Sequence, residues 1–334
     1  MKPTNTEIIL SLLTAFVAIM PLSTMAAAPV QDECSFIREK LQNLPAIGGE
    51  VLVPAGIYTC AAPIVLDRSN TSLAGDGDVT IRLGNNINTP VIIMGDIVTP
   101  PKAIRNVQVS HLKIDGNRWN QKSECWGGKC DGGGTSVIRN NGITVRAVTK
   151  ARIQDVYITS ARSGGIVTEK GCYDLEVDNL TAVDNEFDGF AGYETNGARL
   201  TNLTLSHNRA AGISLDIRFN GNIFKNVKIE SNGDVGIFMR DSSSNIFENV
   251  SIIDSGSHGV FMADADDDEA TCPLSNEFQN LSVVHSRGMG FRLNNACEGN
   301  SLTGVAHFSG NRDGCVSESS IASIEVLGQI LCQE

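Results

Sequence analysis

Apolar and polar positions recur between residues 141 and 311 with a nearly fixed period. A glycine followed by an apolar residue marks each repeat, at Gly142, Gly165, Gly189, Gly212, Gly236, Gly259 and Gly290. The successive steps are 23, 24, 23, 24, 23 and 31 residues. Half a repeat later, a polar residue precedes an apolar one at Asp155, Asn179, Asn202, Asn226, Asn249 and Asn280. Two columns in phase indicate a stacked array, in which each unit buries its apolar side only against its neighbours.

Within each repeat, apolar residues alternate with polar ones, as in the segment Phe-Glu-Asn-Val-Ser-Ile at 247–252. Alternation with a period of two residues is typical of β-strands. The strands are short, Gly, Asn, Asp and Ser mark the corners, and no interval is long enough for a crossover helix. This combination predicts an all-β fold, a single right-handed parallel β-helix. A leucine-rich repeat has a similar length, but the leucines are too few here.

The recurrent asparagines of the second column are predicted to form an inward-facing ladder, in which each amide bonds to the coils above and below. Four of them, Asn179, Asn202, Asn249 and Asn280, begin Asn-X-Ser/Thr sequons. An inward position would leave these sequons unglycosylated. Asn70 begins the one sequon that we expect on the surface.

The amino-terminal part of the chain carries two separate signals. Apolar residues of the segment 31–44 have helical spacing and Pro45 follows, which predicts a short helix that caps the open first coil. Lys2, an apolar run from Ile8 to Met20 and the small residues at 26–28 predict a signal peptide over residues 1–28. Residues 29–334 are then expected to form one β-helix domain, secreted or periplasmic, without a membrane span.

The formal net charge is −12 at pH 7, and no basic stripe of the kind that binds nucleic acid is present. An anionic polymer would therefore need local arginines and lysines, or bridging cations. The chain has nine cysteines, which a secreted protein would keep oxidised. Nearness in sequence favours the pairs Cys34–Cys60, Cys125–Cys130, Cys272–Cys297 and Cys315–Cys332, and leaves Cys172 as a buried thiol.

Near the amino terminus the chain contains Gly48-Gly49-Glu50-Val51, the segment Pro-Ala-Gly-Ile-Tyr at 54–58 and the turn Leu-Ala-Gly-Asp-Gly at 73–77. Together with the cap helix, these segments resemble the amino-terminal region of the pectate-lyase-like β-helix superfamily. The resemblance implies the fold. It does not select one reaction, because that superfamily holds lyases, hydrolases, epimerases and phage tailspikes.

Later segments resemble the mannuronan C5-epimerases that act on alginate. The matching segments are Ile-Asp-Gly-Asn-Arg at 114–118, Ser-Gly-Gly-Ile at 163–166 and Asp-Gly-Phe at 188–190. The catalytic Asp-Pro-His-Glu of that family is replaced here by Val-Thr-Glu-Lys at 167–170. The resemblance therefore implies the scaffold, and no catalytic residue of the family is carried over.

A loop insertion at about 116–140 interrupts the rhythm and contains both tryptophans, Trp119 and Trp126. Long loops on a rigid scaffold often carry binding residues. Two indole faces would form a platform for stacking sugar rings. The alternative is that they only cover the flank of the solenoid.

With each repeat glycine as position zero, the side chains at +1 and +3 are mostly apolar and predicted to face the core. Position +4 carries Arg146, Glu169, Tyr193, Asp216, Arg240, Ala263 and Asn294. Position +5 adds Lys170, Glu194, Asp241 and Asp264. Stacked coils lie about 4.8 Å apart, so we expect one continuous polar strip on the outer face. An exposed β-face with alternating charges that aid solubility is the alternative.

Chemistry on a uronate needs a cation for the carboxylate, a base for the C5 proton and an acid. Arg240 and Arg146 are expected to bind the carboxylate bidentately. Tyr193 is expected to act as base or acid, with its pKa lowered by a neighbouring arginine. Asp216 and Glu169 could instead act as paired carboxylates in hydrolysis. Other polar residues of the strip are expected to contact substrate: Lys170, Arg218 and Asp241.

Two further sites are considered. His258 directly precedes a repeat glycine and is a candidate substrate contact, with an ordinary corner residue as the alternative. The acidic insertion that contains Asp264, Asp266 and Asp268 accounts for the 31-residue step. Clustered carboxylates can bind Ca²⁺, although the spacing fits no EF-hand and a solvated acidic loop is the alternative.

The sequence therefore favours a secreted, monomeric β-helix protein that acts on an acidic polysaccharide resembling alginate or pectate. The favoured reaction is proton abstraction at C5 of a uronate, of the lyase or epimerase type. The Arg, Tyr and Asp strip supports an enzyme. The loss of Asp-Pro-His-Glu supports a non-catalytic carbohydrate-binding or surface module. A glycoside hydrolase is the third possibility.

Overall fold

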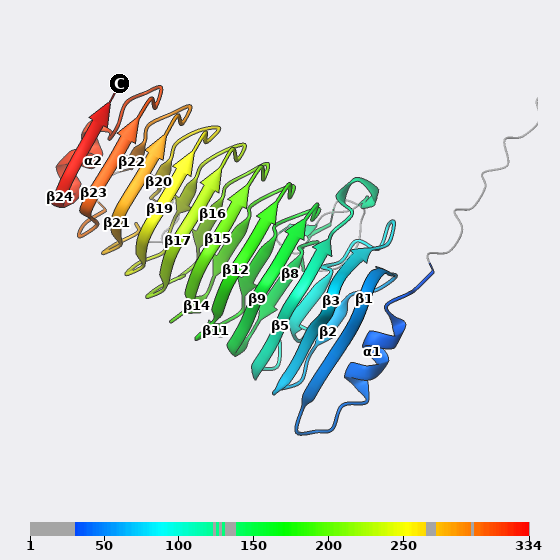
Figure 1. The fold of residues 1–334 in the computed structure, drawn as a ribbon. Helices are drawn as coiled ribbons and strands as arrows, with labels where there is room; N and C mark the ends of the chain where they lie inside the picture. The colour runs from blue at the N-terminus through cyan, green and yellow to red at the C-terminus, as the bar shows by residue number, and fades with distance from the viewer. Residues whose placement is uncertain are drawn as a thin grey trace, which may run out of the picture.

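The computed structural model of this chain describes residues 31–122, 125–126, 129–130, 138–264, 272–294 and 297–333 (Figure 1). For residues 125, 126, 129, 130 and 322 it describes the backbone only. The predicted signal peptide, residues 1–28, lies outside the described part. The described chain winds into an elongated solenoid of parallel strands, so the predicted parallel β-helix is confirmed (Figure 1).

Two parallel sheets run the length of the solenoid. Sheet A has 13 strands: β1 (Gly49–Cys60), β3 (Thr71–Leu83), β5 (Ile104–Asp115), β9 (Val148–Thr159), β12 (Glu176–Val183), β15 (Arg199–Ser206), β17 (Ile223–Glu230), β19 (Ile246–Ile253), β21 (Glu277–Val284), β23 (Ser301–Ser309) and β24 (Glu325–Gln333), with β11 (Cys172–Tyr173) and β14 (Thr195–Asn196) beside them. Sheet B has nine: β2 (Ile64–Leu66), β4 (Ile92–Gly95), β8 (Ile143–Arg146), β10 (Ile166–Glu169), β13 (Phe190–Tyr193), β16 (Ile213–Asp216), β18 (Ile237–Met239), β20 (Val260–Met262) and β22 (Phe291–Leu293).

Strand pairing follows the sequence period. Ile166 pairs with Ile143 on one side and with Phe190 on the other, so residues 23 or 24 positions apart lie side by side. The repeat glycine is required by the close approach of the next coil. A Cβ atom at Gly165 would lie 2.5 Å from the carbonyl oxygen of Gly189, a distance at which no side chain fits.

The core lies between the two sheets. Side chains at +1 and +3 of each sheet B strand are buried, as the alternation predicts. Sheet A contributes stacked phenylalanines at one repeated position, where Phe224, Phe247 and Phe278 have ring centroids 4.9 and 4.7 Å apart. This separation equals the spacing between strands, so each ring packs on the same residue of the next coil.

Two asparagine ladders lie buried at the corners of the coils. In one, Asn185 donates to Asn208 at 2.9 Å and Asn208 donates to Asn232 at 3.0 Å. The other runs through four successive coils, at Asn222, Asn245, Asn276 and Asn300. Each amide also bonds to backbone groups that turn inward at the corner, which removes the cost of burying them.

The asparagines of the second column form a different ladder, which faces solvent. Asn202, Asn226, Asn249 and Asn280 are exposed, and each amide bonds to the side chain of the preceding coil. Their φ angles lie between 54° and 57°, a left-handed conformation that asparagine adopts more readily than most residues. The predicted inward orientation is therefore wrong, although the predicted bonding between coils is confirmed. Burial consequently gives no reason to exclude glycosylation there.

Helices and disulfides close the ends. Helix α1 (Ser35–Gln42) lies within the predicted span and buries Ile37 and Leu41 against the first coil, and α2 (Glu318–Ser323) lies near the last. Three predicted disulfides are confirmed: Cys34–Cys60, Cys272–Cys297 and Cys315–Cys332. The backbone places Cys125 of β6 (Cys125–Trp126) opposite Cys130 of β7 (Lys129–Cys130), but their side chains lie outside the description. Cys172 is a buried free thiol whose pKa burial raises to about 11. No helix in the described ranges is long and apolar enough to cross a membrane.

The buried ladder provides a test of what stabilises the coils. Asn245 accepts from the Asn222 amide at 3.0 Å and donates to the Phe219 carbonyl at 2.9 Å. Asn245→Ala leaves these buried partners unsatisfied and is expected to lower the free energy of unfolding by about 3 kcal/mol. Asn249→Gly, in the exposed ladder, keeps the left-handed backbone and should cost less than about 1 kcal/mol. Urea denaturation measures both, and equal losses would contradict the role assigned to the buried ladder.

Candidate functional site

A cleft of ≈ 500 Å³ lies on the outer face of sheet B. It crosses strands β10, β13 and β16 and the turn that precedes β13. Five of the sequence-predicted site residues line it: Glu169, Lys170, Tyr193, Asp216 and Arg240. The structure adds residues that the sequence did not single out: Arg139, Phe187, Asp188, Ser214, Ile217 and Phe238.

The geometry of the strand ends gathers these side chains. Each sheet B strand is three or four residues long, and the chain turns away from the sheet immediately after it. Lys170, Glu194, Ile217 and Asp241 follow the strands and have φ angles of 64°, 45°, 49° and 45°. This left-handed turn directs polar side chains out of the core, so the +4 and +5 positions of adjacent coils meet at one edge of the cleft.

Asp188 is a buried carboxyl group on the opposite edge. It directly precedes Gly189, and its Oδ1 accepts a hydrogen bond from the Ala211 N–H at 2.9 Å. Burial raises the pKa of Asp188 to about 6, and the Arg139 charge opposes this shift. An acid with this pKa changes protonation state close to neutral pH, as a general acid or base must.

Tyr193 brings a phenol hydroxyl group to the cleft. Burial raises the pKa of Tyr193 to about 12, and the charge on Asp188 raises it further. The expectation that a neighbouring arginine lowers this pKa is therefore wrong, because burial outweighs the Arg139 charge. Tyr193 remains a phenol at neutral pH and is suited to donate a proton rather than to remove one.

Asp216 and Arg240 form an ion pair on neighbouring coils. Nε of Arg240 lies 3.2 and 3.1 Å from the two carboxylate oxygens of Asp216, and a second guanidinium nitrogen also contacts them. The Asp216 side chain is mostly buried, while that of Arg240 is 45% exposed. Arg240 therefore still presents charge to the cleft.

Glu169 is paired with a buried partner. Nε of Arg146 lies 2.6 Å from Oε1 of Glu169. Arg146 is fully buried, and its remaining nitrogens donate to the Asp96 carbonyl at 2.8 Å and to Thr99 Oγ1 at 3.0 Å. The prediction that Arg146 binds substrate on the outer face is therefore wrong, because the segment after β4 folds over it. Burial raises the pKa of Glu169, and the Arg146 charge opposes that rise.

A second hollow of ≈ 620 Å³ continues the cleft past the strand ends. Lys170 and Glu194 line both, so the two form one groove. Arg218 lines the second hollow, and its guanidinium lies 3.7 Å from Glu194. Tyr173 adds an exposed ring there. The groove thus offers both charged groups and an apolar surface to an extended ligand.

Other predicted residues lie outside this groove. His258 accepts the Met289 N–H at 2.9 Å and contacts Arg292 at 3.0 Å, while burial and that arginine lower the pKa of His258. These contacts occupy both ring nitrogens, and the role of His258 as a substrate contact stays a prediction. Asp241 follows Arg240 and lines neither hollow.

Only some of the residues predicted to bind sugar in the loop, or to bind a metal ion, lie within the described part of the chain. Trp119, in the short helix η1 (Arg118–Asn120), is 79% exposed and stacks on the Arg118 guanidinium at 4.4 Å. The side chain of Trp126 and the residues Asp266 and Asp268 lie outside the description. Asp264 is exposed, and the described residues contain no cluster of three potential metal ligands.

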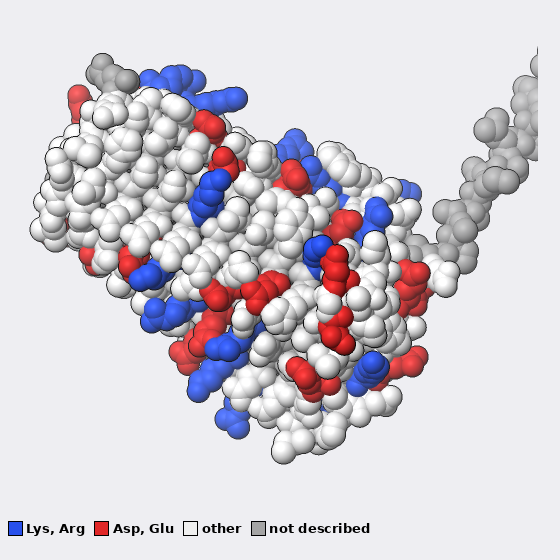
Figure 2. Space-filling view, in the orientation of Figure 1, with Lys and Arg blue, Asp and Glu red and all other residues white. Residues whose placement is uncertain are grey.

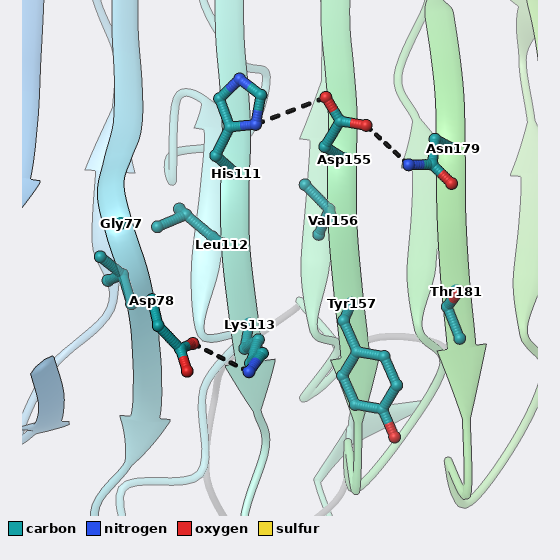
Figure 3. A pocket seen from close by; sticks show the side chains of 11 residues that line it. Gly77, Asp78, His111, Leu112, Lys113, Asp155, Val156, Tyr157, Asn179 and Thr181 are labelled. Atoms are coloured by element: carbon teal, nitrogen blue, oxygen red, sulfur yellow. Dashed lines mark hydrogen bonds and ion pairs between the residues drawn. The ribbon is translucent and has the colours of Figure 1, made fainter. Parts of the chain in front are cut away.

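Sheet A carries a separate, shallower depression of ≈ 330 Å³. Figure 3 shows that polar side chains of this depression point toward one another: His111 faces Asp155 at 3.4 Å, and Lys113 faces Asp78 at 2.8 Å. None of the sequence-predicted site residues is among those that line this depression, so it is a weaker candidate than the cleft on sheet B. Figure 2 shows charges of both signs interspersed on this side of the molecule.

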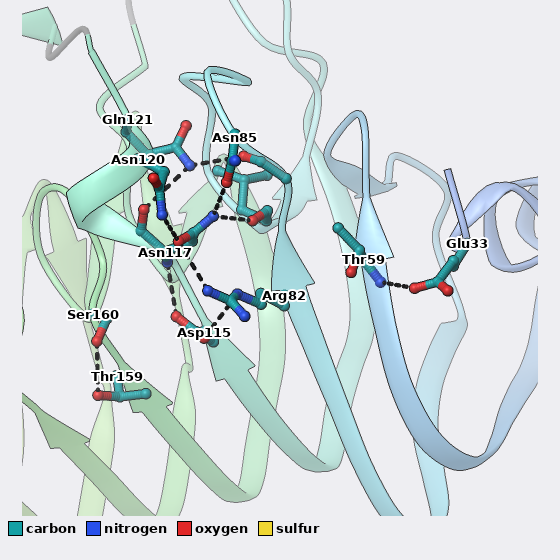
Figure 4. Close-up of polar contacts among 12 residues, drawn as sticks. Glu33, Thr59, Arg82, Asn85, Asp115, Asn117, Asn120, Gln121, Thr159 and Ser160 are labelled. Atoms are coloured by element: carbon teal, nitrogen blue, oxygen red, sulfur yellow. Dashed lines mark hydrogen bonds and ion pairs between the residues drawn. The ribbon is translucent and has the colours of Figure 1, made fainter. Parts of the chain in front are cut away.

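The segment Ile-Asp-Gly-Asn-Arg at 114–118 has a structural role. Asn117 donates to the Leu83 carbonyl and to Asn85, both at 2.9 Å, and accepts from Arg82 at 3.1 Å (Figure 4). Arg82 also pairs with Asp115 at 3.3 Å. These bonds fix the start of the loop, and therefore the direction in which Arg118 and Trp119 leave the sheet.

Comparisons with known proteins address the fold. Residues 141–305 match the family model described as "Right handed beta helix region". No curated protein matches the sequence significantly.

Among solved structures, the A-module of the Azotobacter vinelandii mannuronan C-5 epimerase AlgE4 is 17% identical, with 90% of this chain and 94% of that chain covered and a TM-score of 0.51. A mutant of the periplasmic alginate epimerase AlgG is 14% identical, with 84% and 77% covered and a TM-score of 0.50. ORF18 of Geobacillus virus E2 is 14% identical, with 92% and 59% covered and a TM-score of 0.59. The matched repeats, the parallel pairing and these shared folds identify the chain as a right-handed parallel β-helix protein.

Proposed function

We propose that this protein binds an acidic polysaccharide in the sheet B groove and transfers a proton at C5 of a uronate unit. The observation that carries this proposal is the pairing of Asp188 with Tyr193 in one cleft. The first has a pKa of about 6 and the second a pKa of about 12. Groups whose surroundings separate their pKa values in this way can divide the roles of base and acid.

In the proposed reaction, the Asp188 carboxylate removes the C5 proton of the uronate. The electrons of the broken C–H bond move into the C6 carboxylate, which acquires enolate character. Positive charge must balance the added negative charge. Arg139, Lys170 and Arg240 line the same cleft and are assigned this role.

Tyr193 supplies the second proton. Its phenol interacts electrostatically with Asp188, so the two groups act on one bound sugar. Delivery of the proton to the opposite face of C5 would invert that centre. Delivery to the oxygen at C4, with cleavage of the C4–O bond, would leave an unsaturated sugar. The first outcome is epimerisation and the second is elimination.

Two observations support the polymer as ligand. The groove extends beyond the cleft into the hollow lined by Tyr173 and Arg218, which suits several linked sugars. The neighbours named as mannuronan and alginate epimerases have this fold and offer an analogy for the reaction class. Three disulfides fit a secreted or periplasmic protein.

A non-catalytic carbohydrate-binding module is the second candidate. The carboxylates of Glu169 and Asp216 are already engaged by Arg146 and Arg240. Such ion pairs can hold the shape of the groove without taking part in a reaction. They therefore favour a protein that binds carbohydrate without catalysis.

The first test uses mature protein with alginate, pectate and glycosaminoglycans, with and without Ca²⁺. We expect deuterium from solvent at C5, or unsaturated ends that absorb ultraviolet light, and loss of either signal in Tyr193→Phe. Binding without these signals would reject the enzyme and support the non-catalytic carbohydrate-binding module. New reducing ends that are saturated would indicate a hydrolase instead, and no binding at all would reject both candidates.

The second test concerns Asp188. Its pKa is about 6 in the fold and about 3.9 when unfolded, so its stabilising contribution is present below pH 4 and lost as pH rises through 6. Asp188→Asn should therefore gain about 3 kcal/mol over wild type between pH 4 and pH 8. It should also abolish C5 exchange, while wild-type activity should fall below pH 6. Urea denaturation at both pH values measures the gain, and Asp254→Asn, an exposed site, should show little change.

The third test locates the polymer. Arg240→Ala should weaken binding about tenfold, because a cation of the cleft is lost. Arg292→Ala is the control on the same sheet, where Arg292 contacts His258 and Phe261 instead. Isothermal titration with oligouronates measures both. Equal losses would place the polymer elsewhere.

A further inference from the structure

Three arginines surround one carboxylate at the turn between β12 and β13. The Glu186 carboxylate is contacted by Arg209, and it lies 3.8 Å from Arg118 and 4.0 Å from Arg162. The Glu186 side chain is largely buried, whereas that of Arg209 is 75% exposed. Three positive charges thus meet one negative charge, in a chain whose net charge is −12. We call Arg118, Arg162 and Arg209 the arginine cluster.

The repeat itself builds this cluster. Arg162, Glu186 and Arg209 each lie three residues before a repeat glycine, so they stack on successive coils about 4.8 Å apart. Arg139 occupies the same position one coil earlier, and its guanidinium lies 4.3 Å from the Phe187 ring.

The third arginine of the cluster, Arg118, comes from the loop. Arg118 leaves the sheet after Asn117, which the bonds shown in Figure 4 hold in place. Its Nε is buried and has no hydrogen-bond partner within the described ranges. Trp119 follows it and exposes most of its indole surface. The Arg118 guanidinium also faces Glu186 at 3.8 Å. The loop therefore brings a cation and an exposed indole to the same place, and this combination suits a charged sugar.

The cluster adjoins the proposed cleft. Glu186 is followed directly by Phe187 and Asp188, both of which line the cleft, as does Arg139. The edge of the groove that carries the proposed base therefore continues into the arginine cluster. The far edge carries Lys170 and Arg218 instead. Positive groups thus lie at both ends of one groove.

We infer that the arginine cluster and Trp119 form a subsite for the oxyanion of a second acidic sugar of the bound polymer. The guanidinium groups bind the carboxylate or sulfate, and the indole face covers the sugar ring. Glu186 holds the arginines apart and in place when no ligand is bound. This inference rests on the proposed function. It adds the direction in which the polymer lies and the charge of the sugar next to the reacting uronate.

Arg209→Ala removes the most exposed member of the cluster. Its matched control is Arg287→Ala, because Arg287 also lies three residues before a repeat glycine and is exposed, three coils further along. Isothermal titration against oligouronates, sulfated oligosaccharides and neutral oligosaccharides should show about tenfold weaker binding of the acidic ligand for Arg209→Ala. The control should bind within twofold of wild type, and the loss should shrink as salt increases. Circular dichroism verifies that both variants fold.

Glu186→Gln separates ligand binding from a purely structural role. Removal of the competing carboxylate should tighten binding of the acidic oligosaccharide about threefold, whereas a structural role alone predicts weaker binding or no change. Preference for uronate or for sulfate identifies the oxyanion.

The outcomes for the subsite and for the proposed function differ. If Arg209→Ala binds acidic oligosaccharides as tightly as wild type while Arg240→Ala binds them weakly, the proposed subsite is wrong. The proposal that the groove binds the polymer is then retained. If wild-type protein binds none of the acidic oligosaccharides, both are overturned.

Discussion

Hydrogen bonds between buried amide side chains at the corners of the coils fix the register of this solenoid. Asn208 is bonded to Asn185 on one side and to Asn232 on the other. A coil that slipped by one residue would leave these amides and the turned backbone unsatisfied, at a cost that apolar packing does not replace. The nearly constant length of the coil follows from this requirement.

Because the register is fixed, residues that lie one coil apart in the sequence become neighbours in space. Asp216 and Arg240 are 24 residues apart. They form an ion pair because Asp216 ends β16 and Arg240 directly follows β18, the next strand of the sheet. Glu186 meets Arg162 and Arg209 for the same reason. Charge can therefore gather locally along one groove although the chain as a whole is acidic.

The period and the alternation of apolar residues were sufficient to predict the sheets. Helical spacing over residues 31–44 predicted the cap helix, and nearness in sequence predicted three disulfides, since all of these depend on local spacing. The orientation of Asn202 was not predictable, because a bonded ladder has the same spacing whether it faces the core or solvent. Arg146 is buried by a segment about 50 residues earlier in the chain, which no repeat position indicates. Asp188 was overlooked as a site residue because only burial gives its carboxyl group an unusual pKa.

The 31-residue step shows that the scaffold accepts additional chain between its sheets. The pairing of β20 with β22 keeps Val260 opposite Phe291 and Met262 opposite Leu293, so the additional residues affect neither the strands nor the packed interior. In the sequence they fall between β20 and β21, the interval that supplies Lys170 and Glu194 in earlier coils. Lengthening the same corner in a coil that lines the groove is therefore a route by which evolution or protein engineering can reshape the rim without changing the pairing of the strands.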